Sequence, residues 1–152
     1  YLAINQIQTL SMLLVGVYGV PLLGGVGLEL QGQLWLLPLL SLSVSLVAIS
    51  LALFIATRVR SIEQATTIGG ISNLILAAVG GVMVPTHVMP EFMQSAAAFS
   101  PMHWGLEGFF SILLRHGGIE MVGPEIVKLL LLAGALFLLA LCSYRKLLDK
   151  KT

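Results

Sequence analysis

The chain has 152 residues, of which 57% are hydrophobic and only 10% are charged. A soluble globular domain carries about 25% charged residues, so this composition predicts a membrane protein. The formal net charge is +1, and there is no basic stripe or run of like charges, so nothing in the sequence indicates nucleic-acid binding. A single cysteine, Cys142, rules out an internal disulfide bond.

Four apolar segments are long enough to cross a membrane. A helix rises about 1.5 Å per residue, so about 20 residues cross a hydrocarbon core about 30 Å thick. These segments predict a single domain of the all-α class, a polytopic membrane helical bundle with four transmembrane helices. Their expected bounds are residues 7–27, 34–57, 66–84 and 125–144. Because the sequence begins with Tyr1 rather than methionine, we also expect it to be part of a longer protein.

Polar and small residues inside the second and third spans are candidates for packing or for lining a pathway. Ser43 and Ser50 lie in the second span, where small hydroxyl residues allow helices to approach closely. Asn73 lies in the third span and must find a hydrogen-bond partner, because an unmet polar group in hydrocarbon costs several kcal/mol. We interpret these residues, with Gly69 and Gly70, first as interhelical contacts and keep pathway lining as the alternative for the polar ones.

The segment 85–118 breaks the apolar pattern. It holds two short apolar helices, the first starting after Pro90 and the second at Pro101 with Ser100 as its expected N-cap. An apolar stretch of about 10–14 residues is more often interfacial or re-entrant than spanning, and irregular backbone at membrane depth needs a covering of protein or a cavity. We therefore predict an outer re-entrant or interfacial helical cap over 85–118. Its candidate gate residues are Gly80, Gly81, Pro85, Pro90, Pro101 and Trp104.

The distribution of basic residues predicts the orientation in the membrane. Four spans place the loop after the second span on the same side as the C-terminal tail. That side holds six of the eight Lys and Arg residues, namely Arg58, Arg60, Arg145, Lys146, Lys150 and Lys151. Short loops rich in Lys and Arg stay in the cytoplasm, so the loop and the C-terminus should be cytoplasmic and the cap should face outside.

Several spaced elements match, in order, those of a known family. The third span runs into Gly81-Val82-Met83-Val84-Pro85, followed by Met89-Pro90, Met93-Gln94, Ser100-Pro101, Trp104 and an ending with Arg115 and Gly117-Gly118. The turn from Gly19 to Gly25 and the boundary from Thr57 to Ala65 are also similar. Together these elements resemble the C-terminal part of the permease (transmembrane) subunit of a type-2 ABC transporter.

The resemblance implies a six-span permease of which this chain supplies the last four spans, so an N-terminal part with two spans is missing. It implies an exporter made of two permease halves, identical or different, and two ATP-binding cassette ATPase subunits. The permease would form the pathway for a hydrophobic or amphipathic, multidrug-type solute across the cytoplasmic (inner) membrane. The outer re-entrant helices would close its extracellular end, and ATP would be hydrolysed on the separate subunit.

The loop RVRSIEQ is the candidate docking site for that ATPase. Arg58, Arg60 and Glu63 would present charges to a partner at the cytoplasmic face. The alternative is that these charges only fix the topology. Both roles are compatible.

Motifs for chemistry on the chain itself are missing from the sequence. No Walker A pattern is present, so no phosphate-binding loop, catalytic residue or bound cofactor is expected. His87, His103 and His116 are too widely spaced to predict a metal site. An intramembrane enzyme would need clustered His, Asp or Glu in the spans. The remaining alternative to a transport subunit is a non-transporting membrane scaffold or assembly subunit.

Overall fold

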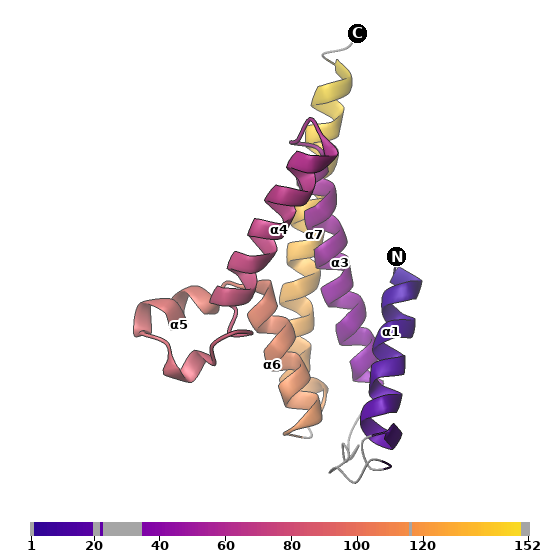
Figure 1. Cartoon of the computed structure of the whole chain (residues 1–152), viewed down its shortest axis with the longest axis vertical. Helices are drawn as coiled ribbons and strands as arrows, with labels where there is room; N and C mark the ends of the chain where they lie inside the picture. The colour runs from indigo at the N-terminus through magenta and orange to yellow at the C-terminus, as the bar shows by residue number, and fades with distance from the viewer. Residues whose placement is uncertain (1, 20–21, 23–34, 116, 150–152) are drawn as a thin grey trace.

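The computed structural model describes residues 2–19, 22, 35–115 and 117–149, and all regular structure within them is helical. Figure 1 shows an elongated bundle in which α3 (Leu36–Ala56) and α7 (Ile119–Asp149) lie at the centre. The all-helical class expected from the sequence is confirmed.

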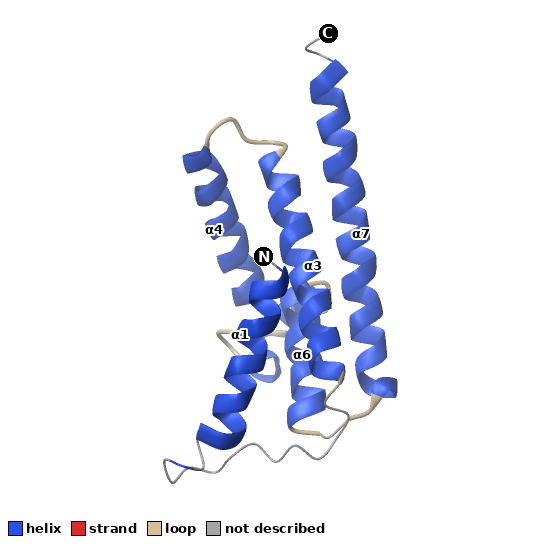
Figure 2. Ribbon diagram, turned by 90° about the vertical axis from the view of Figure 1, so that its right-hand side faces the viewer, coloured by secondary structure: helices blue, strands red, loops and turns tan. Residues whose placement is uncertain are grey.

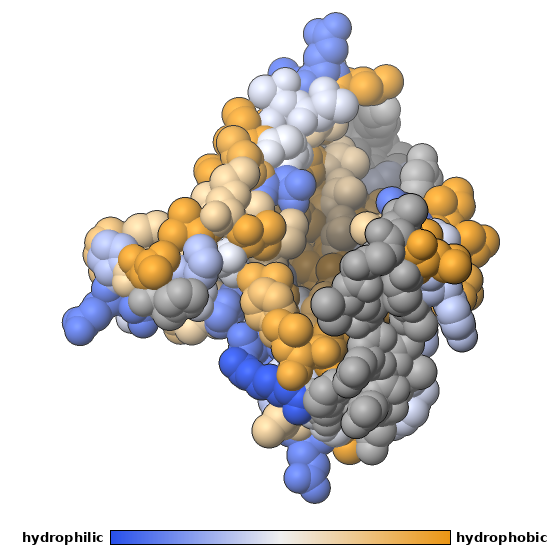
Figure 3. Space-filling model, turned by 60° about the horizontal axis from the view of Figure 1, so that its bottom comes forward, coloured by the Kyte–Doolittle hydropathy of each residue, from blue (hydrophilic) through white to orange (hydrophobic). Residues whose placement is uncertain are grey.

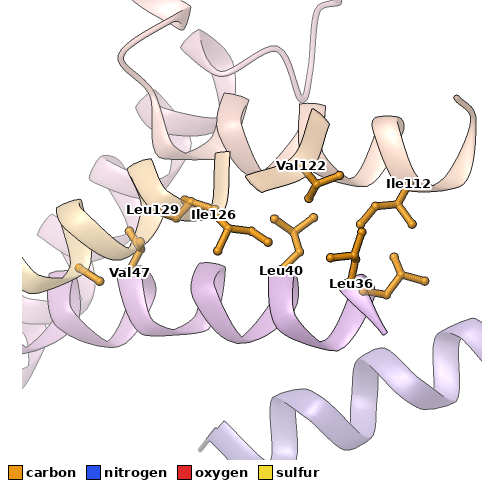
Figure 4. Close-up of a cluster of buried hydrophobic side chains, with 9 residues drawn as sticks. Leu36, Leu40, Val47, Ile112, Val122, Ile126 and Leu129 are labelled. Carbon is orange, nitrogen blue, oxygen red and sulfur yellow. The ribbon is translucent and has the colours of Figure 1, made fainter. Parts of the chain in front are cut away.

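Three helices form the core because their apolar faces meet. Leu36, Leu40 and Val47 of α3 pack against Ile112 of α6 (Pro101–Leu113) and against Val122, Ile126 and Leu129 of α7 (Figure 4). Leu36, Leu40 and Leu129 are fully buried. Two glycines let α6 approach α3 closely: an added Cβ would lie 3.1 Å from a methyl of Val44 at Gly105 and 2.8 Å from a methyl of Leu40 at Gly108.

Three helices in the described part of the chain are long and apolar enough to span a membrane: Leu36–Ala56, Ile62–Val79 and the segment Ile119–Arg145 of α7. The predicted second span agrees with α3 to within two residues at its start and one at its end. The predicted first span, 7–27, is not confirmed. There the structure has α1 (Leu2–Leu14), followed by the π-helix η1 (Val15–Gly19), and the rest of that span lies almost entirely outside the described residues.

The third span begins and ends earlier than predicted. Helix α4 covers Ile62–Val79, instead of 66–84. Its start is fixed by Ser61, whose hydroxyl accepts the backbone N–H of Gln64 at 3.1 Å, while Gln64 Oε1 accepts the N–H of Arg60 at 3.1 Å. A serine followed three residues later by glutamine is a capping signal that the sequence carries. The four-residue shift places Glu63 within the first turn of the helix.

The last helix also begins earlier than predicted. We expected 125–144, but α7 starts at Ile119 and continues through Pro124. Proline lacks an N–H and its ring crowds the preceding residue, which usually ends a helix there. Here Pro124 is the sixth residue of α7, so its missing N–H costs the helix one hydrogen bond, but the preceding Gly123 has no Cβ for the ring to crowd. The helix therefore extends beyond the predicted span at both ends.

The segment between α4 and α7 is neither a single crossing nor an unstructured loop. After α4 ends, the 3-10 turn η2 (Thr86–Val88) and α5 (Glu91–Ala97) project sideways as an arm (Figures 1 and 3). Helix α6 then continues away from the α3–α4 loop and packs against α3 and α7 (Figure 1). Figure 2 shows that the loop joining α3 to α4 lies towards the same end of the bundle as the C-terminus. The broken segment lies away from that end.

Candidate functional site

A groove opens between α3 and α4. It has a volume of about 410 Å³, and the start of α6 and Leu129 of α7 complete its walls. Its lining comprises Val44, Val47, Ala48, Leu51, Ala52, Ile55, Gly69, Gly70, Asn73, Leu76, Pro101, Met102 and Leu129. The groove thus runs along most of α3 and ends where α6 begins.

The polar part of this wall comes from α4. The exposed Asn73 side chain lines the groove, and no other described residue forms a hydrogen bond with its amide. A Cβ added to Gly69 or Gly70 would meet nothing within 4 Å. These two glycines therefore line open space and make no close contact with another helix of the described chain, and our interpretation of them as packing glycines stays a prediction.

Helix α4 has two chemically different faces. At 3.6 residues per turn, Gly69, Gly70 and Asn73 share the side that lines the groove, whereas Ile68, Ile71 and Ile75 lie on the opposite side. Those isoleucines are exposed to 39%, 54% and 57%. In a membrane, bulky aliphatic side chains suit lipid, whereas small and polar residues belong against protein or a cavity. The sequence of α4 therefore directs its small, polar face into the groove.

The two serines predicted with Asn73 lie elsewhere. Ser43 is 1% exposed and Ser50 is 5% exposed, and neither lines the groove. The Ser43 hydroxyl donates to the carbonyl of Leu39 at 2.9 Å, one turn earlier in the same helix. Of the three polar candidates, the structure brings only Asn73 to the cavity.

The end of α4 is held against the start of α6 by close contacts at Gly80. A Cβ added to Gly80 would lie 2.6 Å from Met102 Cβ and 2.7 Å from the Leu76 carbonyl oxygen. The hydroxyl of Ser100 donates to that same carbonyl at 3.2 Å. Ser100 is the N-cap residue of α6, as predicted, but its side chain binds the end of α4 and makes no capping bond to its own helix. Gly81 has a φ of 88°, which favours glycine.

The other gate candidates are divided between the groove and the arm. Pro101 lines the groove, whereas the exposed Pro85 and Pro90 start η2 and α5 in the projecting arm. Trp104 on α6 connects that helix to the end of the arm, because its indole Nε1 donates to the carbonyl of Ala98 at 2.8 Å. The ammonium of Lys128 on α7 lies 6.0 Å from the centre of the Trp104 ring, within the range of a cation–π contact.

The predicted docking loop is exposed at the end of the bundle near the C-terminus. Arg58, Arg60 and Glu63 are all exposed. The guanidinium of Arg58 lies 5.1 Å from the centre of the Phe54 ring, which orients it along the end of α3. These three side chains make no ion pair with any described residue, so their charges are available to a partner.

Sequence reasoning missed two functional features of this region. Leu76 and Met102 line the groove at the contact between α4 and α6, but aliphatic residues carry no sequence signal for that role. Asn5 and Gln6 join α1 to α3: Asn5 Nδ2 donates to the Ser45 hydroxyl at 3.0 Å, and the Ser41 hydroxyl donates to Gln6 Oε1 at 2.8 Å. Amides in an uncharged apolar segment were the available signal for this contact.

Metal binding has no support in the described part of the chain, where no group of three His, Cys, Asp or Glu residues could hold an ion.

Residues 4–114 match the family described as ABC-2 type transporter. The chain belongs to the ABC-2 type transporter family. The resemblance to type-2 ABC permeases is thus confirmed.

Two named relatives of this ABC-2 chain are also permeases. It is 30% identical over 148 residues to the inner membrane transport permease YhhJ of Escherichia coli K12, covering 95% of this chain and 37% of YhhJ. It is 28% identical over 99 residues to the linearmycin resistance permease protein LnrN of Bacillus subtilis 168, covering 65% of this chain and 24% of LnrN. The chain therefore spans well under half the length of these relatives. No solved structure matches it.

Proposed function

We propose that this chain forms part of the solute pathway in the permease subunit of an ATP-driven exporter, and that its cargo is a hydrophobic or amphipathic solute. The observation that carries the proposal is the groove whose small, polar wall on α4 leads to the start of α6. Membership of the ABC-2 family and the permease names of its relatives support a transport role over an enzymatic one.

The energy would come from a separate ATP-binding cassette ATPase that docks on the loop between α3 and α4. The exposed Arg58, Arg60 and Glu63 supply charges that a partner can pair. On this proposal, the loop and the C-terminus face the cytoplasm, and a second permease half, identical or different, completes the pathway. The bulky outer face of α4 contacts membrane lipid or that second half.

The outer gate would be formed by the contact between Gly80 and Met102 together with the arm that follows it. Closure is proposed because this contact lies at the end of the groove and joins two helices that are not continuous. Separation of α4 from α6 would open that end. The role of Pro85 and Pro90 is to break the chain into the short helices that allow such movement.

Transport in inside-out vesicles tests the proposal. The full-length permease is reconstituted with its ATP-binding subunit, and ATP-dependent, vanadate-sensitive uptake of candidate amphiphiles is measured. We expect uptake that falls at least several-fold with Asn73→Leu and stays unchanged with Ile75→Leu on the opposite face of α4. A complex that assembles fully but shows no ATP-dependent uptake of any candidate would favour the scaffold role instead.

A further inference from the structure

The groove between α3 and α4 has the chemistry of a site for one class of solute. We propose that it binds an elongated amphiphile whose aliphatic part lies along α3 and whose single uncharged hydrogen-bonding group meets Asn73. The solute would enter sideways from the membrane. This inference rests on the proposed transport function and names the substrate class and its binding residues.

The charge of the groove lining decides what can bind there. None of the lining residues is charged or aromatic, and Asn73 supplies its one polar side chain. A charged group in such a place would be desolvated without a partner, at a cost far above that of a neutral polar group. The part of the solute inside the groove must therefore be uncharged. A charged group on the same molecule would have to lie outside it.

The side chain of Asn73 determines which polar group the solute must carry. Its carboxamide carries both donors and an acceptor, and none of these is bonded to another described residue. A polar group facing an apolar cavity is costly until it is paired. A hydroxyl, amide or ester of the solute would satisfy the Asn73 side chain and fix the position of the molecule along the groove.

The dimensions of the groove favour a chain-like molecule. The lining residues on α3 run from Val44 to Ile55, which corresponds to a length of about 16 Å at the rise of a helix. The volume of about 410 Å³ lies within the range of small-molecule sites, which is roughly 300–1,000 Å³.

The position of α4 provides the side entrance. Helix α4 has no buried residue, and it diverges from α3 below their connecting loop (Figure 1). Because Gly69 and Gly70 add no side chains, α4 leaves the groove wide where it faces α3. A membrane-dissolved amphiphile can therefore reach Asn73 without first entering water.

Photolabelling of the full-length permease with its ATP-binding subunit in lipid nanodiscs, without nucleotide, tests the site. The probe is dodecanamide carrying a photoreactive diazirine, and the control probe is a trimethylammonium compound of the same chain length. We expect the amide probe to label peptides from residues 44–55 and 69–76 and the cationic probe to leave them unlabelled. Equal labelling by both probes would overturn the uncharged-solute assignment.

Two variants and a matched control locate the labelling. Gly69→Leu should abolish it by filling the groove, since the structure leaves room there for the new side chain. Asn73→Leu should raise the half-saturating probe concentration about fivefold, the size expected for one lost hydrogen bond. Ile75→Leu, on the opposite face, should label as the unmodified protein does.

The outcomes separate this inference from the proposed function. If Gly69→Leu labels normally, or if a diazirine amino acid placed at residue 70 crosslinks only to another helix of the permease, the groove is a protein contact and the solute site is wrong. In that case ATP-dependent export of other solutes would still support the transport function. Labelling in the groove without any ATP-dependent export would leave the site intact and remove the export role.

Discussion

Glycine has two different uses in this chain, and neighbouring side chains distinguish them. At Gly80, an added Cβ would collide with Met102, Leu76 and Ser100, so the residue permits the contact between α4 and α6. At Gly69 and Gly70, an added Cβ would meet open space. The sequence shows glycine in all these places, but only the structure shows which ones allow close packing.

The contact at Gly80 should be sensitive to a single methyl group. We expect Gly80→Ala to destabilise the protein by about 1–3 kcal/mol, because backbone and Cβ atoms must move to admit the methyl. Gly69→Ala is the matched control and should be neutral or slightly stabilising, since alanine favours a helix by about 1 kcal/mol. Thermal unfolding in detergent, followed by circular dichroism, measures both. Equal stability of the two variants would contradict the close packing at Gly80.

Trp104 should hold the arm to the bundle through its indole nitrogen. Trp104→Phe keeps an aromatic ring near Lys128 but removes the hydrogen bond to the carbonyl of Ala98. We expect the amides of residues 91–98 to exchange with deuterium about two- to tenfold faster, the factor for one net hydrogen bond. Exchange in α3 should not change. Unchanged exchange in residues 91–98 would show that the arm is held by other contacts.

At the scale of the helices, the apolar pattern predicts that a helix is present more reliably than it predicts the residues at which the helix begins and ends. Helix α3 carries no charge and is strongly apolar apart from its serines, so its bounds were predicted to within two residues. The start of α4 was missed because Ile62, Glu63 and Gln64 were assigned to the preceding loop. The N-cap at Ser61, which places these three residues in the helix, was not taken into account. The start of α7 was missed because Pro124 was taken as a boundary, whereas the helix continues through it.

Helix α1 is joined to α3 by two hydrogen bonds between side chains, beside the apolar contact that Leu13 makes with the core. No residue of α1 is buried, yet two amides of α1 bond to serines one turn apart on α3. A double-mutant cycle of Asn5→Ala with Ser45→Ala should give a coupling energy of about 0.6 kcal/mol, the average found for such bonds in membrane proteins. Unfolding titrations in mixed micelles supply the four free energies. A coupling energy of zero would mean that this bond does not join the two helices.

At the scale of the whole molecule, the sequence predicted that the basic loop and the C-terminus share one end of the bundle, but it did not predict the groove. The loop RVRSIEQ and the C-terminal helix end both carry basic residues, and they lie towards the same end of the bundle (Figure 2). The groove could not be predicted, because it depends on how far α4 diverges from α3. Asn73 was identified from the sequence as a polar group needing a partner. Ser43 and Ser50 were equally good candidates for lining the pathway, and only the structure shows that they are buried and lie outside the groove.

Labelling of Cys142 tests the proposed orientation. Cys142 is exposed and lies in the part of α7 towards the C-terminal end. In intact cells, a membrane-impermeant maleimide should leave it unmodified, whereas it should react in inside-out vesicles. A cysteine introduced at exposed Phe92 in the arm, in a Cys142→Ser background, should show the opposite pattern. Labelling of Cys142 from outside would reverse the orientation.

The central claim is that a groove between α3 and α4 is closed at its end by the contact of α4 with α6. The most direct test introduces Leu76→Cys and Met102→Cys in a Cys142→Ser background. A short bis-methanethiosulfonate bridges the pair, because each cysteine thiolate displaces a sulfinate and forms a disulfide that a reducing agent cleaves. ATP-dependent export by the full complex should stop when the bridge forms and recover when it is cleaved, while each single-cysteine variant exports throughout. Export at the full rate with the bridge complete would contradict the account.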